Sequence, residues 1–134
     1  MNVPLFVVPF FAWLVAGSLK FAVNSLRSKG LAFEQIGYGG FPSNHSSIVA
    51  SVACFTGVRA GIDSLYFGLA VAFAFIVILD AASLRRHVGR QAEAINRLAS
   101  AGQPRLRERI GHTRLEIAGG VAVGVLVGFV CASL

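Results

Sequence analysis

Two histidines have neighbours of the kinds and at the spacings that suit acid–base chemistry. His45 lies in the segment GGFPSNHSS, residues 39–47, directly ahead of an apolar stretch. His112 precedes Glu116 by four residues, about one turn of an α-helix. A carboxylate can orient an imidazole, and an imidazole can act as a nucleophile or a general acid. These residues therefore form a candidate catalytic set.

Basic residues supply the charge that an anionic substrate needs, and the candidates are Lys20, Arg27, Arg85, Arg86 and Arg107. Two imidazoles, a carboxylate and several cations suit phosphoryl transfer. The cations neutralise the phosphate oxygens, one imidazole attacks phosphorus, and the other protonates the leaving oxygen. The cysteines lack metal-ligand spacing, and we expect no metal or other cofactor.

Each of these residues also has a simpler interpretation. An isolated histidine can line a helix mouth or lie at the membrane interface, and arginine-rich loops commonly attract anionic lipid headgroups. Asp80 can be satisfied by Arg85 or Arg86 for structure alone, although a carboxylate within a membrane span is by default a functional candidate. The combination of these groups, more than any single residue, favours catalysis.

The composition is that of an integral membrane protein. Apolar residues make up 55% of the 134 and charged residues 13%, and the mean hydropathy is +0.70. A spanning helix needs ~20 mostly apolar residues. We therefore predict one all-α transmembrane domain over residues 1–134. It is a bundle of about four spans plus an interfacial amphipathic helix. We expect the lipid bilayer to be a partner and expect no nucleic acid to bind. The predicted spans are residues 4–21, 43–62, 64–84 and 115–134.

The second span has an alternative interpretation. Its uncharged run, residues 46–58, is short enough for a buried or re-entrant segment. The first span is expected to stay in the protein, because no Lys or Arg precedes it and no small-residue cleavage site comes before Lys20. Cys54 and Cys131 lie inside apolar helices, where a thiol behaves as a small hydrophobic group.

The twelve Lys and Arg residues are divided unevenly among the three loops. Three fall in the first loop, Arg59 alone falls in the second, and eight fall in the third, residues 85–114. By the positive-inside rule the first and third loops are cytoplasmic. This predicts a multi-pass protein of the inner (plasma) membrane, with the candidate site on the cytoplasmic side and both chain ends outside.

The third loop has a helical pattern of its own. Between Arg85 and Leu98 apolar residues recur every three or four positions, which predicts that the third span continues as an amphipathic helix along the membrane surface. The segment AGQP, residues 101–104, ends this helix, and Pro104 is expected to open the next one.

The last span carries a stripe of small residues, Gly120, Gly124 and Gly128. Such a stripe lets membrane helices approach closely, within the bundle or across a dimer. Glu116 lies on the same stripe, and so does His112 if the helix begins before it.

Together these residues resemble the type 2 phosphatidic acid phosphatase superfamily, which also includes vanadium haloperoxidases and has the motifs K-x6-R-P, P-S-G-H and S-R-x5-H-x3-D. Lys20 and Arg27 have the spacing of the first motif, and PSNH, residues 42–45, matches three letters of the second. His112 with Glu116 matches H-x3-D with a longer acid. The segments GGFPSNHSS, DAASLRRHVGRQAEAIN and RERIGHTRLEIAGG are similar to the divergent bacterial and plastid branch.

The chain also departs from the superfamily pattern. Ser28 replaces the proline of the first motif, Asn44 replaces the glycine of the second, and Leu106 stands where the third has arginine. The missing cation is expected from an arginine of the third loop: Arg85, Arg86 or Arg107. The superfamily usually has six helices, so four spans suggest that a second copy completes the bundle as a homodimer.

The resemblance implies roles for individual residues. His112 is the nucleophile that forms a phosphohistidine, Glu116 holds its other ring nitrogen, and His45 is the general acid for the departing alkoxide. The residues implied to bind the phosphate are Lys20, Arg27, Ser43, Asn44 and one of the three arginines, with Asp80 in support.

The implied substrate is a membrane lipid phosphomonoester or diphosphate, of the phosphatidic acid, phosphatidylglycerol phosphate or polyprenyl phosphate type. A pocket of this shape can also hold vanadate for peroxidation, but a small, deeply apolar chain favours lipid turnover. The rivals from other classes are a small anion transporter or channel and a protein that binds lipid headgroups without turnover.

Overall fold

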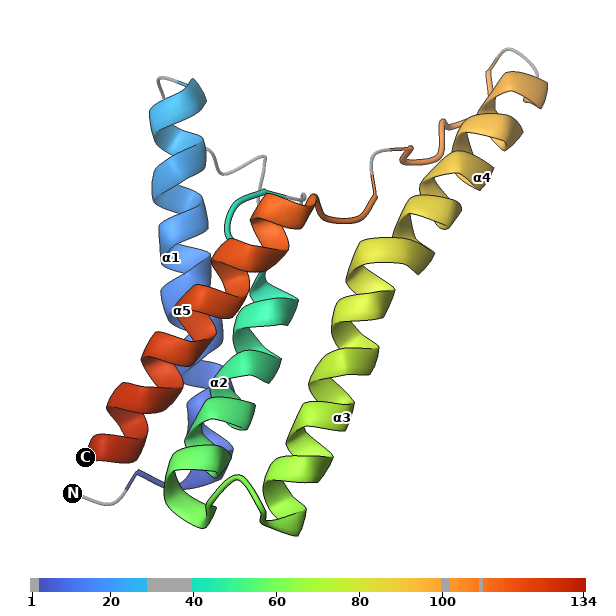
Figure 1. Cartoon of the computed structure of the whole chain (residues 1–134). Helices are drawn as coiled ribbons and strands as arrows, with labels where there is room; N and C mark the ends of the chain where they lie inside the picture. Colours follow the sequence, from blue (N-terminus) through green and yellow to red (C-terminus); the bar gives the residue numbers. More distant parts are fainter. Residues whose placement is uncertain (1–2, 29–39, 100–101, 109) are drawn as a thin grey trace.

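The protein is a bundle of helices in the computed structural model, which describes residues 3–28, 40–99, 102–108 and 110–134 (Figure 1). A short 3-10 turn leads into the first helix, and the described part of the chain contains no strand. In chain order the elements are η1 (Leu5–Val7), α1 (Val8–Ser28), α2 (Asn44–Ala60), α3 (Leu65–Leu79), the π-helical turn η3 (Asp80–Leu84), α4 (Arg85–Leu98) and α5 (Arg114–Ser133).

Within the described residues, three helical stretches are long and apolar enough to cross a membrane: Leu5–Leu26, Leu65–Leu98 and Arg114–Ser133. The second of them is one rod made of α3, η3 and α4 (Figure 1). The predicted all-α membrane fold is therefore confirmed. The remaining predicted span forms α2, which has 17 residues and is shorter than those three stretches, so a count of four crossings stays a prediction.

The central helix is α2, which packs against α1, α3 and most extensively against α5. Its contact with α5 is a ladder of small residues. Each of the three stripe glycines of α5 faces a serine carbonyl of α2, in the pairs Gly120–Ser43, Gly124–Ser47 and Gly128–Ser51. A Cβ built on any of these glycines would come within 2.4 Å of that carbonyl oxygen. The predicted stripe therefore serves packing inside the bundle.

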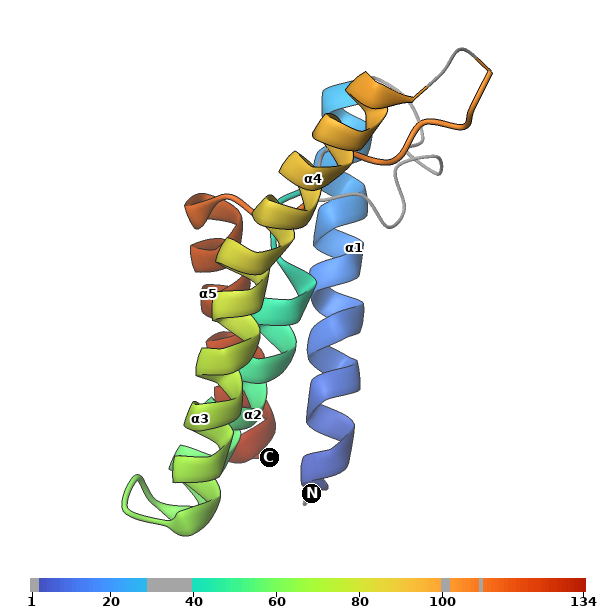
Figure 2. The ribbon, with the colours of Figure 1, turned by 90° about the vertical axis from the view of Figure 1, so that its right-hand side faces the viewer.

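This register makes α2 and α5 parallel, so both helices begin at the same end of the molecule. Ser43 caps α2 and Thr113 caps α5. The two chain termini lie at the other end (Figures 1 and 2). Because the first N–H groups of a helix have no intrahelical partner and its dipole is positive there, the end with both caps suits an anion.

The segment before α5 is not helical. The expectation that Pro104 opens the last helix is wrong, because α5 begins only at Arg114 and residues 104–108 have no helical structure. We call residues 104–108 the strap, since they lie against α4.

Hydrogen bonds to one buried side chain explain why the strap stays extended. Asn96 of α4 donates from Nδ2 to Leu106 O (2.7 Å) and accepts at Oδ1 from Leu106 N–H (2.8 Å). Its Nδ2 also lies 2.9 Å from Glu108 Oε1. Close approach is possible because Gly89 has no side chain: a Cβ there would lie 2.3 Å from Glu108 O. The amide thus satisfies backbone groups that a helix would satisfy internally.

Candidate active site

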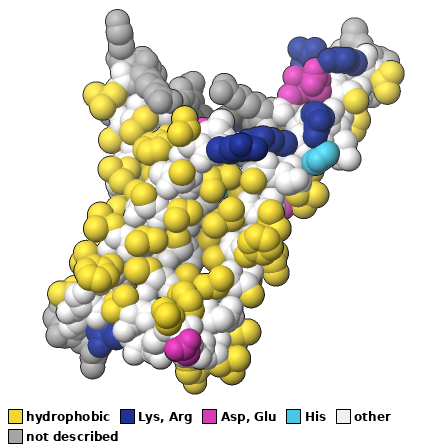
Figure 3. Space-filling model, viewed as in Figure 1, with side chains coloured by type: hydrophobic (Ala, Val, Ile, Leu, Met, Phe, Trp, Pro, Cys, Tyr) yellow, Lys and Arg dark blue, Asp and Glu magenta, His cyan; other side chains and the backbone are white. Residues whose placement is uncertain are grey.

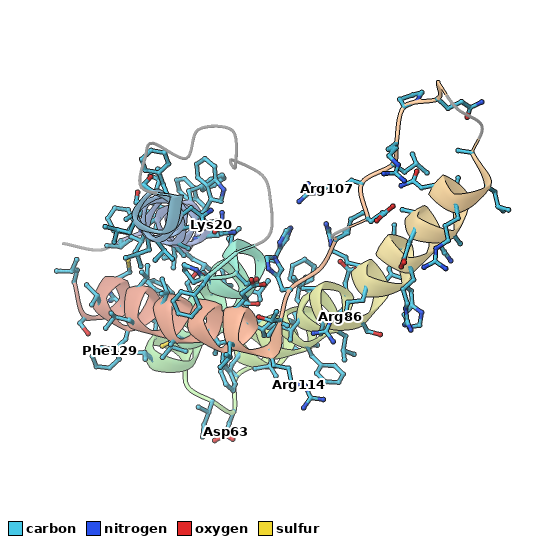
Figure 4. The ribbon with its side chains drawn as sticks, turned by 90° about the horizontal axis from the view of Figure 1, so that it is seen from above. Lys20, Asp63, Arg86, Arg107, Arg114 and Phe129 are labelled. Atoms are coloured by element: carbon cyan, nitrogen blue, oxygen red, sulfur yellow. The ribbon has the colours of Figure 1, made fainter. Side chains whose placement is uncertain are left out.

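The described candidate residues meet at the end where α2 and α5 begin. Most of the Lys and Arg side chains visible in Figure 3 gather at this end, and hydrophobic side chains cover most of the remaining face. Seen from above, Lys20 of α1 and Arg86 of α4 lie on either side of α2 (Figure 4). Four elements, α1, α2, η3–α4 and α5, therefore contribute to one site.

His112 is buried, with 8% of its surface exposed, and its backbone is held from both sides. Its N–H donates to Ala81 O (3.2 Å), within the π turn, and its carbonyl accepts from Arg86 Nη2 (3.0 Å). A π turn carries one extra residue, so a carbonyl of the turn can bond outside its own helix. The turn η3 therefore fixes the position of His112.

One carboxylate oxygen of Glu116 forms hydrogen bonds with both the helix cap and the imidazole of His112. Its Oε2 accepts from Thr113 N–H (2.9 Å) and lies 3.2 Å from His112 Nδ1. Thr113 Oγ1 in turn accepts from Glu116 N–H, which completes a capping box. His112 precedes the cap, so it is not on the helical stripe, but it still meets Glu116. With a proton on Nδ1 towards the carboxylate, the lone pair of the ring is on Nε2.

The pKa of His112 is lowered from its usual value, mainly because burial disfavours the charged ring. The hydrogen bond that His112 donates to Glu116 and the negative charge of Glu116 raise the pKa, while the positive charges of Lys20 and Arg85 lower it. The net result is a neutral imidazole at neutral pH. A neutral ring with a free lone pair is the form that can attack an electrophile.

His45 faces His112 from the first turn of α2. Their ring centroids lie 6.1 Å apart and the rings are tilted by 57°. His45 is exposed, whereas His112 is buried. Electrostatic interactions couple His45 to Arg85, His112, Lys20 and Asp80, so the two imidazoles share their charged neighbours.

The predicted cations differ in how they meet the histidines. Lys20 and Arg85 act electrostatically on both rings, and Arg86 binds the backbone of His112. Arg85 Nε also donates to Asp80 Oδ2 (3.1 Å). Both partners of that pair are more than a third exposed, and such pairs contribute only ~0–1 kcal/mol. The pair therefore orients Arg85 more than it stabilises the fold.

The other two predicted cations are Arg107 and Arg27. Arg107 belongs to the exposed strap and points towards the side of the bundle where α1 lies (Figure 4). The side chain of Arg27, in the last turn of α1, lies outside the described part of the structure.

Ser43 and Asn44 shape the turn that leads into α2. Ser43 is fully buried, its Oγ accepts from Ser46 N–H (3.3 Å), and its own N–H donates to Glu116 O (2.8 Å). Ser43 therefore joins the start of α2 to the first turn of α5, and its contact with a phosphate stays a prediction. Asn44 Oδ1 is buried and has no hydrogen-bond partner among the described residues.

Two residues that hold the site were not predicted from the sequence. A π turn cannot be recognised in the sequence, so Ala81 gave no signal. Asn96 did give a signal, because it shares a helix face with Gly89 and Ala92, where a polar side chain between small residues indicates a specific partner.

In the described part of the chain, no group of three or more His, Cys, Asp or Glu side chains is arranged to hold a metal ion.

Comparisons with known proteins agree with this architecture. A model described as "Divergent PAP2 family" matches residues 1–127. The uncharacterized membrane protein YuiD of Bacillus subtilis (strain 168) is 29% identical over an alignment of 140 residues. The alignment covers 90% of this chain and 89% of YuiD. No solved structure matches the chain. Since the family model covers nearly the whole chain, the protein belongs to the divergent PAP2 family and is a PAP2-related, multi-pass membrane protein.

Proposed function

We propose that the protein is a metal-independent lipid phosphatase that works through a phosphohistidine. The observation that carries this proposal is the pair of imidazoles, His45 and His112, whose centroids lie 6.1 Å apart with Glu116 hydrogen-bonded to Nδ1 of His112. Two rings at this separation can both contact one phosphoryl group that lies beside them. In the described structure His112 is the ring that is hydrogen-bonded to a carboxylate, which gives the two histidines different tasks.

In the first step, Nε2 of His112 attacks phosphorus and the bond from phosphorus to the lipid oxygen breaks. The leaving alkoxide takes a proton from His45, so the lipid departs as an alcohol or, from a diphosphate, as a monophosphate. The positive charge that develops on His112 is stabilised by Glu116 through Nδ1. The product of this step is a phosphohistidine.

In the second step, water attacks the phosphohistidine. His45, now neutral, takes a proton from the water while the bond between phosphorus and Nε2 breaks. Inorganic phosphate leaves, and both imidazoles return to their starting protonation states. The same histidine thus acts first as an acid and then as a base.

The positive charges of the site stabilise the phosphate oxygens in both steps. Lys20 and Arg85 already act on both histidines, and the N-termini of α2 and α5 add the partial charge of their free N–H groups. A protonated phosphate oxygen can donate to the unpartnered Asn44 Oδ1. Arg27, Arg86, Arg107 and Ser43 complete the proposed binding set, and Asp80 supports it by orienting Arg85.

The proposed substrates are the phosphomonoesters and diphosphates of membrane lipids: phosphatidic acid, phosphatidylglycerol phosphate and polyprenyl phosphates. We place the reaction at the cytoplasmic face of the plasma membrane, because the basic residues lie at the site end. The apolar surface of the bundle keeps the enzyme in the same layer as the substrate.

The test is phosphate release by the purified protein from these lipids in detergent, with and without a chelator. His112→Gln is expected to abolish release and phosphoenzyme formation, and His45→Gln to lower kcat by ~10²–10⁴. The third histidine is a matched control: His87 is exposed on α4 and contacts Arg90, so His87→Gln should keep wild-type activity.

Each alternative predicts a different result. Phosphate release that survives in His112→Gln would exclude the nucleophile, and strict dependence on a divalent ion would exclude the metal-independent mechanism. Lipid binding without release by the wild type would identify a headgroup-binding protein. Anion flux into proteoliposomes without hydrolysis would identify a transporter.

A further inference from the structure

An almost wholly apolar groove of about 570 Å³ lies along α2, between the start of α1 and the first half of α3. Its floor is formed by Ile48, Val49, Val52 and Thr56 of α2. The hydroxyl of Thr56 donates to Val52 O (2.8 Å), so the floor presents no unsatisfied polar group. The proposed reaction does not use this groove.

The groove floor and His45 lie on one face of α2. Counted from His45, the floor residues follow at three, four, seven and eleven positions, which is the spacing of one helical face. The opposite face packs on the glycines of α5 through Ser43, Ser47 and Ser51. Since α2 rises 1.5 Å per residue, the floor extends to ~16 Å beyond His45. The groove therefore starts one turn from the proposed acid.

The two ends of this face differ in charge. At the His45 end, Lys20 and Arg85 supply positive charge. One turn further along, the surface becomes apolar and remains so to Thr56. A surface with cations at one end and an apolar trough beyond complements an amphiphile that has an anionic head and a hydrocarbon chain.

We propose that this groove binds one hydrocarbon chain of the phosphorylated lipid, and that it selects substrates by chain length. This inference rests on the proposed function, because it places the head of the same lipid between His45 and His112. A helix of a second copy fits less well: with side chains it is ~11 Å wide, so the ~12 Å from Ile48 to Thr56 would have to hold roughly 1,100 Å³ of it, about twice the groove volume. A single extended hydrocarbon chain is narrow enough to lie along the groove floor.

Two alanines of α3 provide a matched test. Ala70 lines the groove, whereas Ala72 is exposed and does not line it. We compare kcat/KM for hexadecyl phosphate and butyl phosphate in the wild type, Ala70→Trp and Ala72→Trp. The wild type should prefer the long chain, Ala70→Trp should reduce that preference at least ~10-fold, and Ala72→Trp should preserve it. Equal loss on both substrates, or no loss, in Ala70→Trp would overturn the groove assignment.

A second measurement does not depend on turnover. Hexadecyl phosphate with a photoreactive group near the end of its chain should label peptides of α2 and α3 in the wild type, at least several-fold less in Ala70→Trp, and at wild-type level in Ala72→Trp. Labelling confined to α4 or α5 would contradict the proposal. A disulfide between the introduced cysteines of two copies of Val52→Cys would also contradict it, because it would show that a second copy covers the groove. If no lipid phosphate is hydrolysed but α2 and α3 are labelled, the catalytic proposal fails, and the assignment of the groove as a binding site for a hydrocarbon chain stands.

Discussion

Glu116 links the fold of α5 to the chemistry of His112. One carboxylate oxygen caps the helix through Thr113 N–H and holds the Nδ1 side of the imidazole. A glutamine in this position can still accept from the cap N–H, so Glu116→Gln removes the negative charge and keeps the capping geometry. The charge of this residue can therefore be tested separately from its structural role.

We predict that Glu116→Gln moves the acid limb of the kcat/KM profile to lower pH. The proposed nucleophile, His112, must be neutral, and burial lowers its pKa, so the wild-type limb set by this group lies below about 6.5. Because Glu116 raises the pKa of His112, removal of its charge lowers that pKa further. We also expect the maximal rate to fall on the order of 10²-fold, since the developing imidazolium loses its partner.

The measurement is the pH dependence of phosphate release by both proteins on the same substrate, so that titration of the substrate itself cancels. A limb that moves to higher pH, or does not move, would contradict the assigned interaction between Glu116 and His112. Thermal unfolding of the variant should stay close to that of the wild type, which excludes loss of the cap as the cause.

The sequence could predict the pairing of His112 with Glu116 from their spacing, although His112 lies just before the helix cap and meets Glu116 through the capping turn. It could not predict the burial of Ser43, which depends on the contact between α2 and α5. The unpartnered oxygen of Asn44 depends on the same packing. Local spacing is visible in a sequence, whereas the direction of a side chain at a turn depends on what packs over it.

At the scale of elements, the α2–α5 ladder controls the distance between the two helix N-termini of the site. We predict that Gly124→Ala destabilises the protein by about 1–3 kcal/mol, because the new Cβ would lie 2.3 Å from Ser47 O and 2.8 Å from Ala50 Cβ. Gly68→Ala in α3 is the control: nothing lies within 4 Å of its Cβ position, and alanine favours the helix by ~1 kcal/mol. The thermal midpoint in detergent should fall for the first variant and not for the second.

The strap allows a second test at this scale. Asn96→Ala removes hydrogen bonds to Leu106 and Glu108, which costs ~1–3 kcal/mol. This corresponds to a 5- to 150-fold increase in strap opening. Trypsin should then cut faster after Arg105 and Arg107, by a similar factor when the strap opens and closes faster than trypsin cleaves it.

Gln91→Ala on the exposed side of α4 should leave this cleavage unchanged. Equal protection of the strap in Asn96→Ala and the wild type would show that other contacts hold it.

The helices themselves were predictable, because runs of apolar residues and small-residue stripes mark membrane helices directly. The strap was not: Pro104 is a good first residue of a helix, and the sequence does not show that Asn96 will bind the backbone near it instead. The π turn also has no sequence signature, although it provides the carbonyl that binds His112 N–H. Hydrogen bonds to other parts of the fold determine the conformation of both segments.

At the scale of the whole molecule, charge is distributed along the long axis. Of the Lys and Arg side chains that the structure describes, Arg59 lies in the last turn of α2, at the end far from the site, and the others lie towards the site end. The sequence predicted this asymmetry because it depends only on the order of spans and loops. It could not predict that α2 is the central helix, which is what brings α1, η3 and α5 together around one pair of histidines.

The charge asymmetry predicts that the site end faces the cytoplasm. In a background with Cys54→Ala and Cys131→Ala, Asp63→Cys places a thiol in the exposed connection between α2 and α3, and Gln103→Cys places one beside the strap. A membrane-impermeant maleimide should label Asp63→Cys in sealed right-side-out vesicles and Gln103→Cys only after the vesicles are opened, because basic ends remain on the cytoplasmic side. The reverse pattern would place His45 and His112 at the outer leaflet. The proposed phosphatase would then act on lipid phosphates exposed outside, and the arginines around the site would be present to bind substrate instead of setting the orientation.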